Sequence, residues 1–181
     1  MATSSISRRI ESSVEALGKK DYESAFIHLF PAIDKTAKKR RSKDGVGKRI
    51  KAFISDEEAI ITAVAANNII QNITVDGIDF PTALYKFGRT SIAHEGELDE
   101  RLQINETGSI QIGHVWNLPS SYITGLIVSV IGSPENLGEQ VHDSLGVTLF
   151  GEMFKVNDIL GKKEIIQNKI CEVLKNDDLF K

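Results

Sequence analysis

The sequence contains one cysteine, Cys171, among its 181 residues. A lone cysteine forms no internal disulfide and supplies no thiolate pair to a zinc site, so we expect neither to stabilise this fold. The chain also lacks an apolar run that reaches the roughly 18 residues of a membrane span. Its first residues, Met1 to Arg9, contain no apolar block of the signal-peptide type. These absences predict a cytoplasmic protein with no membrane partner.

Histidine is scarce as well, with four residues in the chain. No two of them, among His28, His94, His114 and His142, have the spacing of metal ligands, so we expect no metal site and no cofactor. The segment Gly45-Val46-Gly47-Lys48-Arg49 lacks the glycine spacing of a phosphate loop and the hydroxyl residue after its lysine. Metalloenzyme and P-loop chemistry are therefore not indicated.

What is present is the composition of a folded globular protein. A hydrophobic fraction of 41% and a chain of 181 residues suit one core, which predicts a single domain over residues 1–181. Apolar residues recur at helical spacing along most of the chain, which predicts a mainly α fold. The predicted helices cover residues 6–17, 21–33, 48–54, 56–73, 80–95, 122–131 and 158–174.

Local signals refine these predictions. Asp21 and Ser55 are expected to cap helices, and Pro31 is expected to kink or break its helix near Phe30. Residues 102–115 alternate apolar and polar side chains, which predicts a small β-hairpin with Gly108 in its turn.

Positive charge is concentrated in one part of the chain. Residues 35–51 contain nine basic residues and one acidic residue, a net charge of +8; because the whole chain carries −3, the remainder sums to −11. A basic stripe on an acidic body is typical of a protein that meets a polyanion. The alternative interpretation is a solvated helix end followed by a loop.

Arg89 and His94 form the most informative pair. A permanently charged guanidinium beside an imidazole that titrates near neutrality suits phosphate chemistry. His94 lies in the last turn of its predicted helix, where the helix dipole favours the charged imidazole. On a straight helix, five steps of about 100° leave the two side chains some 140° apart. In the alternative interpretation, Arg89 pairs with an acid such as Glu95 or Asp99, and His94 caps the helix end.

The segment Arg89-Thr90-Ser91-Ile92-Ala93-His94 resembles the Arg-x4-6-His motif of HEPN domains (higher eukaryotes and prokaryotes nucleotide-binding domains). The flanking residues Tyr85-Lys86-Phe87 and His94-Glu95-Gly96-Glu97-Leu98 are similar to that family, as is the upstream stretch from Phe30 to Lys38. Trp116-Asn117-Leu118-Pro119 before an apolar helix adds to the resemblance, which covers about two-thirds of the chain. The resemblance implies a HEPN-like helical bundle with a small β-hairpin insertion near residues 102–115.

The resemblance also implies a function. HEPN domains dimerise with their motif helices facing each other, so that each protomer supplies one arginine and one histidine to a shared cleft. Catalytic members cleave RNA without a metal ion. Arg89 would then bind the phosphate, and His94 would transfer the proton. The basic stripe would attract the RNA backbone through Lys38, Lys39, Arg40, Arg41, Lys43, Lys48 and Arg49.

Many relatives of this kind act as toxins or in defence against phage, which implies an antitoxin or a regulatory partner. Two positions depart from the pattern. Thr90 follows the arginine where many catalytic members have Asn, Asp or His, and Gly96 stands where one toxin branch has Tyr. A non-catalytic module that binds RNA, a nucleotide or a protein partner therefore stays open as the alternative.

Overall fold

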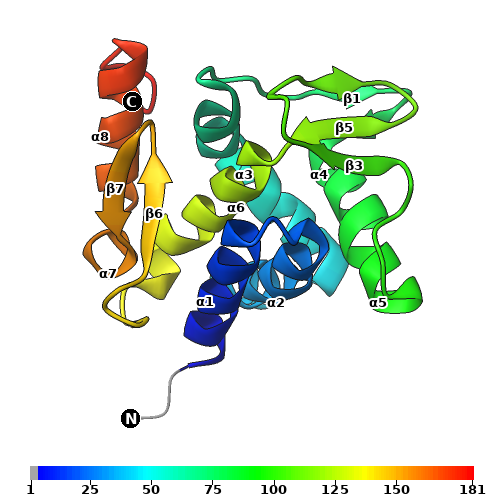
Figure 1. The fold of residues 1–181 in the computed structure, drawn as a ribbon. Coiled ribbons are helices and arrows are strands. Elements are labelled where there is room, and N and C mark those ends of the chain that lie inside the picture. Colours follow the sequence, from blue (N-terminus) through cyan, green and yellow to red (C-terminus); the bar gives the residue numbers. More distant parts are fainter. Residues whose placement is uncertain (1–3) are drawn as a thin grey trace.

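The computed structural model describes residues 4–181, and its fold is mainly α-helical with small sheets, as predicted (Figure 1). The helical segments are α1 (Ser5–Gly18), α2 (Tyr22–Arg40), α3 (Val46–Ala66), α4 (Phe80–Ala83), the π-helix η1 (Leu84–Thr90), α5 (Ser91–Glu95), α6 (Ser121–Gly132), the 3-10 turn η2 (Pro134–Asn136), α7 (Val156–Ile159) and α8 (Lys163–Leu174).

The first two helices pack against each other after a short turn. Asp21 caps α2, as predicted, because its carboxylate accepts a hydrogen bond from the Ser24 amide at 3.0 Å. The predicted break at Pro31 is wrong, because α2 continues through this residue to Arg40. Phe26 and Phe30 are buried and stacked at 5.3 Å, and this packing outweighs the backbone hydrogen bond that proline removes.

Helix α3 begins earlier and ends earlier than predicted. Ser55 is an exposed residue inside the helix and not its N-cap, because buried Phe53 and Ile54 join the two predicted helices into one. The helix ends where Asn67 adopts the left-handed conformation, with φ at 51°. Glu57 and Glu58, which a helix start at Ser55 would place in an exposed first turn, are buried in its middle.

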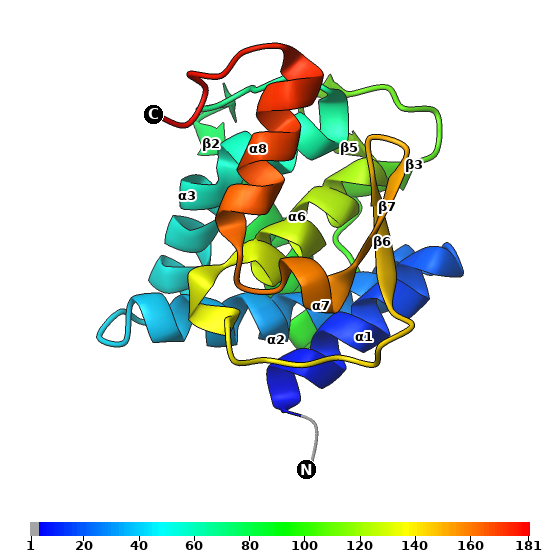
Figure 2. The same ribbon diagram turned by 90° about the vertical axis from the view of Figure 1, so that its left-hand side faces the viewer.

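Helix α6 lies at the centre of the molecule (Figures 1 and 2). It contacts α1, α2, α3 and α8, and all of its residues except Ser121 and Thr124 are buried. In Figure 2, α8 covers one side of α6. The buried apolar residues form one continuous cluster around this helix, which is the stabilising core of the fold.

The predicted β-hairpin is the clearest error. Strands do form at β3 (Leu102–Asn105) and β4 (Gln111–Ile112), but β5 (Trp116–Pro119) lies between them. It runs parallel to β3 and antiparallel to β4. Trp116 and Leu118 are buried, so β5 takes the central position, which the alternation of the two outer strands did not reveal.

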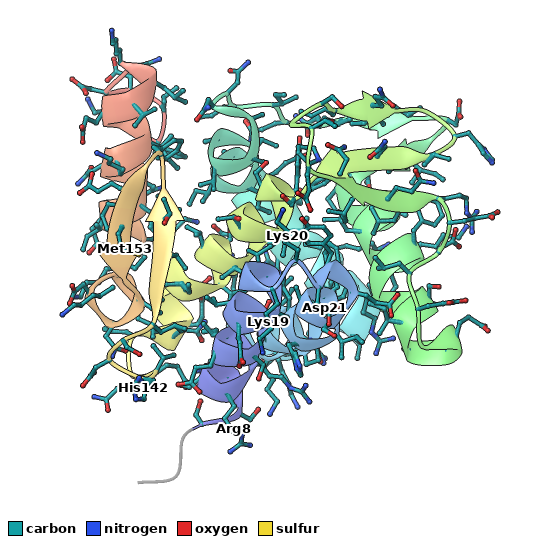
Figure 3. All side chains as sticks on the ribbon, in the orientation of Figure 1. Arg8, Lys19, Lys20, Asp21, His142 and Met153 are labelled. Atoms are coloured by element: carbon teal, nitrogen blue, oxygen red, sulfur yellow. The ribbon has the colours of Figure 1, made fainter. Side chains whose placement is uncertain are left out.

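Two further strand pairs complete the fold. Strands β1 (Thr74–Val75) and β2 (Ile78–Asp79) form a short antiparallel ribbon before α4. Strands β6 (Gly146–Leu149) and β7 (Glu152–Lys155) form a hairpin on the opposite side of the molecule from α4 and α5, where Met153 is exposed (Figures 1 and 3).

Candidate functional site

The motif residues lie on a helical limb built from α4, η1 and α5 in succession. Asp79 caps its start by accepting a hydrogen bond from the Thr82 amide at 2.7 Å, and Pro81 stands in the first turn, as predicted. Gly96 ends α5 in the left-handed conformation with φ at 84°, also as predicted. The π-helical turn at its centre was not predicted; such turns are rare and occur often at functional sites.

Gly88 allows this limb to pack closely on α2. A Cβ atom at this position would lie 2.7 Å from Phe30 Cζ and 3.3 Å from Leu102 Cδ2, both closer than side chains normally approach. Only glycine permits this packing without a shift of the buried Phe30 ring. The contact places the next residue, Arg89, at the boundary between the limb and α2.

The half-buried Arg89 side chain has no carboxylate partner in the described part of the chain. Its Cζ atom lies 5.9 Å from the centroid of the Tyr85 ring, a cation–π contact. The pairing with Asp99 proposed in the alternative interpretation is absent, because Arg101 binds that carboxylate at 2.8 Å and 2.6 Å. The same hydrogen bonds lower the pKa of Asp99 to about 2.

Arg89 lines a cavity of about 260 Å³ between α2 and the limb. The cavity is lined by Phe26, Ile27, Phe30, Pro31, Asp34, Arg89, Ile92 and Ala93. Its walls are mostly apolar, and Asp34 and Arg89 are its two charged groups. Arg49 holds the Asp34 carboxylate with two hydrogen bonds, at 2.7 Å and 3.0 Å. The site therefore combines an unpaired cation, a fixed carboxylate and an apolar floor.

His94 does not line this cavity. Its side chain is exposed and has no hydrogen bond or ion pair with residues 4–181. Arg89 lies in the π-helix η1 and His94 in the α-helix α5, and the absence of His94 from the Arg89 cavity is consistent with the angular separation expected on a helix. One chain alone does not bring the two groups into one cavity.

The basic stripe divides into paired and free residues. Lys38 and Lys43 are exposed and have no partner in the described residues. The other predicted RNA-binding residues form ion pairs within the chain, and these pairs are Lys39–Glu139, Arg40–Glu57, Arg41–Asp56, Lys48–Asp44 and Arg49–Asp34. An open cavity of about 480 Å³ next to the free Lys38 is lined by Ser4, Ser5, Ile6, Lys35, Lys38, Lys39, Ser42 and Glu139.

Arg40 is the most heavily paired of these residues. Its guanidinium contacts Asp56, Glu57 and Glu135 at 2.8–3.0 Å, and its Cζ lies 5.0 Å from the Phe53 ring. Burial acts against the charge, but hydrogen bonds to Glu135 and Glu57 raise the pKa of Arg40 above its usual value. Its partners lie far away in the sequence, so the charge run alone could not separate this structural arginine from a binding residue.

On the other side of α5, the surface is mainly acidic. A cavity of about 680 Å³ there is lined by Ser91, Glu95, Glu97, Leu98, Asp99, Glu100, Arg101 and His114. Its acidic residues would repel RNA, so an anionic ligand is expected to reach Arg89 from the α2 side.

Within residues 4–181, no cluster of three or more His, Cys, Asp or Glu side chains is placed to hold a metal ion.

The remaining histidines lie elsewhere. The His28 Nδ1 atom accepts a hydrogen bond from the Arg9 guanidinium at 2.9 Å, and burial together with the arginine charge lowers the pKa of His28. His142 lies on the side of the molecule away from α5 (Figure 3).

No helix within residues 4–181 has the length and apolar character needed to span a membrane.

Comparisons with known proteins identify similar sequences and a family. The uncharacterized protein Rv1289 of Mycobacterium tuberculosis is 22% identical over 171 residues, which cover 84% of this chain and 81% of the relative. The uncharacterized protein Mb1320 of Mycobacterium bovis matches with the same identity and coverage. No solved structure matches the chain. The Rv1289 family matches residues 5–177, and the chain therefore belongs to that family.

Proposed function

We propose that this protein is a metal-independent endoribonuclease of HEPN type that acts as a homodimer in the cytoplasm. The observation that carries the proposal is the unpaired guanidinium of Arg89 beside an open cavity. A role as a toxin or in phage defence, with an antitoxin or regulatory partner, is supported by the resemblance of the motif to HEPN domains.

Arg89 has no carboxylate partner within residues 4–181, unlike four other arginines of this part of the chain. Arg40, Arg41, Arg49 and Arg101 each bind a carboxylate, and acidic residues outnumber basic ones by 25 to 22. An arginine that stays unpaired in such a chain is free to bind an external anion. The planar guanidinium matches the geometry of a phosphate, with which it forms paired hydrogen bonds.

His94 supplies the group that moves a proton. In the proposed reaction the ribose 2′-oxygen attacks the adjacent phosphorus, and the bond from phosphorus to the 5′-oxygen breaks. His94 takes the proton from the 2′-oxygen or delivers one to the departing 5′-oxygen, while Arg89 stabilises the added negative charge. DNA is not cut, because it lacks the 2′-hydroxyl.

A dimer reconciles this chemistry with the divergence of the two side chains. His94 is exposed and outside the Arg89 cavity of its own chain. In a two-fold symmetric dimer with facing motif helices, Arg89 of one protomer meets the histidine of the other. The free lysines Lys38 and Lys43 lie on and just after α2, which also lines the Arg89 cavity, and would attract the RNA backbone.

Cleavage of mixed RNA in the presence of EDTA tests the proposal. Arg89→Ala and His94→Ala should each reduce the rate about 100-fold or more. Lys86→Ala and His114→Ala are matched controls, because they remove an exposed cation and an exposed histidine outside the proposed site. Undiminished cleavage by either site variant would remove the assignment, and RNA binding without cleavage in the wild type would favour the non-catalytic module.

Mixing the two inactive variants tests the dimer. If the site is shared between protomers, a mixed dimer of Arg89→Ala and His94→Ala contains one intact site. Random exchange should then restore about a quarter of the wild-type activity, because half of the dimers are mixed and each has one of its two sites intact. A mixture that stays inactive while the chains exchange would show that the two groups do not act across a dimer.

A further inference from the structure

We propose that the cavity beside Arg89 binds one nucleobase, and that Asp34 selects a base that has an exocyclic amino group. The inference rests on the proposed function, because it takes RNA as the ligand of Arg89. It goes further by naming the nucleotide: adenosine, cytidine or guanosine in a single strand, in preference to uridine.

The size and walls of the cavity suit a base. Its volume of about 260 Å³ lies below the range of about 300–1,000 Å³ typical of drug-sized ligands, which fits one flat ring system. Ile27, Pro31 and Ile92 supply apolar lining against which a base can pack, and the buried rings of Phe26 and Phe30, which stack on each other, line the same cavity. A base in a duplex has its faces and edge occupied, so the cavity favours a single strand.

Asp34 provides the polar contact. Its side chain is 29% exposed, and Arg49 holds it in place with two hydrogen bonds. A carboxylate has about four acceptor positions, so each oxygen keeps one for a ligand. Asp34 and Arg89 line the same cavity without forming an ion pair. The cavity can therefore receive a phosphate at Arg89 and a base edge at Asp34 together.

The chemistry of the bases gives the selectivity. Adenine, cytosine and guanine have amino groups that donate hydrogen bonds to a carboxylate. Uracil has no amino group, and its one ring N–H donor stands between two carbonyl oxygens, which a carboxylate repels. A fixed acceptor at the cavity rim thus discriminates against uracil even though all four bases match the apolar walls.

Isothermal titration calorimetry of the wild-type protein with each of the four nucleoside 5′-monophosphates tests the inference. AMP, CMP and GMP should bind about tenfold more tightly than UMP, which is the discrimination that one charge-assisted hydrogen bond supplies. Inorganic phosphate should bind more weakly than all three. Equal affinity for the four nucleotides, or affinity no greater than that of inorganic phosphate, would overturn the proposal.

Two variants test whether the base selectivity and the nucleotide binding arise in this cavity. Asp34→Asn replaces one acceptor with a donor, so the ratio of AMP to UMP affinity should fall to about one; the ratio does not depend on the folded fraction of the variant. Ala93→Phe places a ring at the exposed cavity mouth and should block every nucleotide. Glu95→Phe is its control, because it adds the same ring to α5 outside this cavity. An unchanged ratio in the first variant or unchanged affinity in the second would refute the assignment.

These measurements separate the two proposals. Selective nucleotide binding by a protein that never cleaves RNA would leave the base cavity in place and remove the nuclease. Cleavage that depends on Arg89 and His94, with no base preference in binding, would support the nuclease and remove the base cavity.

Discussion

Replacement of Arg40 tests how the basic stripe divides between structure and binding. The Arg40→Met variant keeps an apolar stem over Phe53 and removes the guanidinium that contacts the fully buried Glu57 at 2.8 Å. Breaking a buried ion pair from one side costs about 3–5 kcal/mol, because the remaining charge stays buried without compensation. Lys163 still pairs with Glu57 at 2.8 Å, so we expect the lower end of that range, about 3 kcal/mol.

Thermal and urea denaturation followed by circular dichroism measure this loss. For a chain of this length, about 3 kcal/mol corresponds to a fall in Tm of roughly 6–12 °C. The double variant Arg40→Met with Glu57→Gln should lose less than the sum of the single variants, because the second change removes the charge that the first leaves unpaired. Lys38→Ala is the matched control: we expect unchanged stability within about 0.5 kcal/mol and weaker RNA binding. A loss below about 1 kcal/mol for Arg40→Met would refute the structural role.

Three further predictions concern packing and pH. Gly88→Ala should destabilise the fold by about 1–2 kcal/mol, since the clash with Phe30 outweighs the better helix propensity of alanine; an unchanged Tm would contradict this. Burial and the Arg9 charge lower the pKa of His28 below 6.5, so the unfolded chain binds more protons and stability falls as the pH drops through that value; His28→Gln should flatten urea-derived stability between about pH 7 and 5. Burial raises the pKa of Glu58 above 4.5, so the unfolded chain binds fewer protons than the folded one and the stability of the fold falls as the pH rises through that range. Glu58→Gln should therefore be more stable than the wild type at about pH 8 but not at about pH 4. Parallel stability profiles of the two proteins would exclude this explanation.

Short-range signals predicted the features of the fold that depend on a few neighbouring residues. Asp21 caps its helix and Gly96 ends one, because each acts on backbone groups within a single turn. Helical periodicity likewise located α1 and α6 to within a residue or two. These features arise from local geometry, which the sequence states directly.

Features that depend on distant residues were not predictable in this way. Ser55 matches the pattern of a cap, but its helix continues through it because Phe53 and Ile54 are buried against the core. Strand β5 separates β3 from β4 because Trp116 is buried, and the alternation of β3 and β4 says nothing about a third strand.

The candidate site shows the same division. The motif identified Arg89 and His94 as a pair, and their joint role stays a prediction. The cavity beside Arg89 was not foreseen, because its floor and its fixed carboxylate come from α2, far from the motif in sequence. Gly88 was the one local signal: a glycine inside a helical pattern indicates a close approach of another element.

Arg101 satisfies Asp99, the acid that the sequence offered as a partner for Arg89. The Asp99 amide donates a hydrogen bond to the Phe87 carbonyl at 3.0 Å, which holds this carboxylate near the π-helical turn that contains Arg89. Arg101 binds both oxygens of Asp99 and stacks on the Phe87 ring at 4.3 Å. These contacts fix Arg101 on the Asp99 carboxylate. The turn before β3 thus supplies the cation that satisfies Asp99, and the Arg89 guanidinium has no carboxylate partner within residues 4–181.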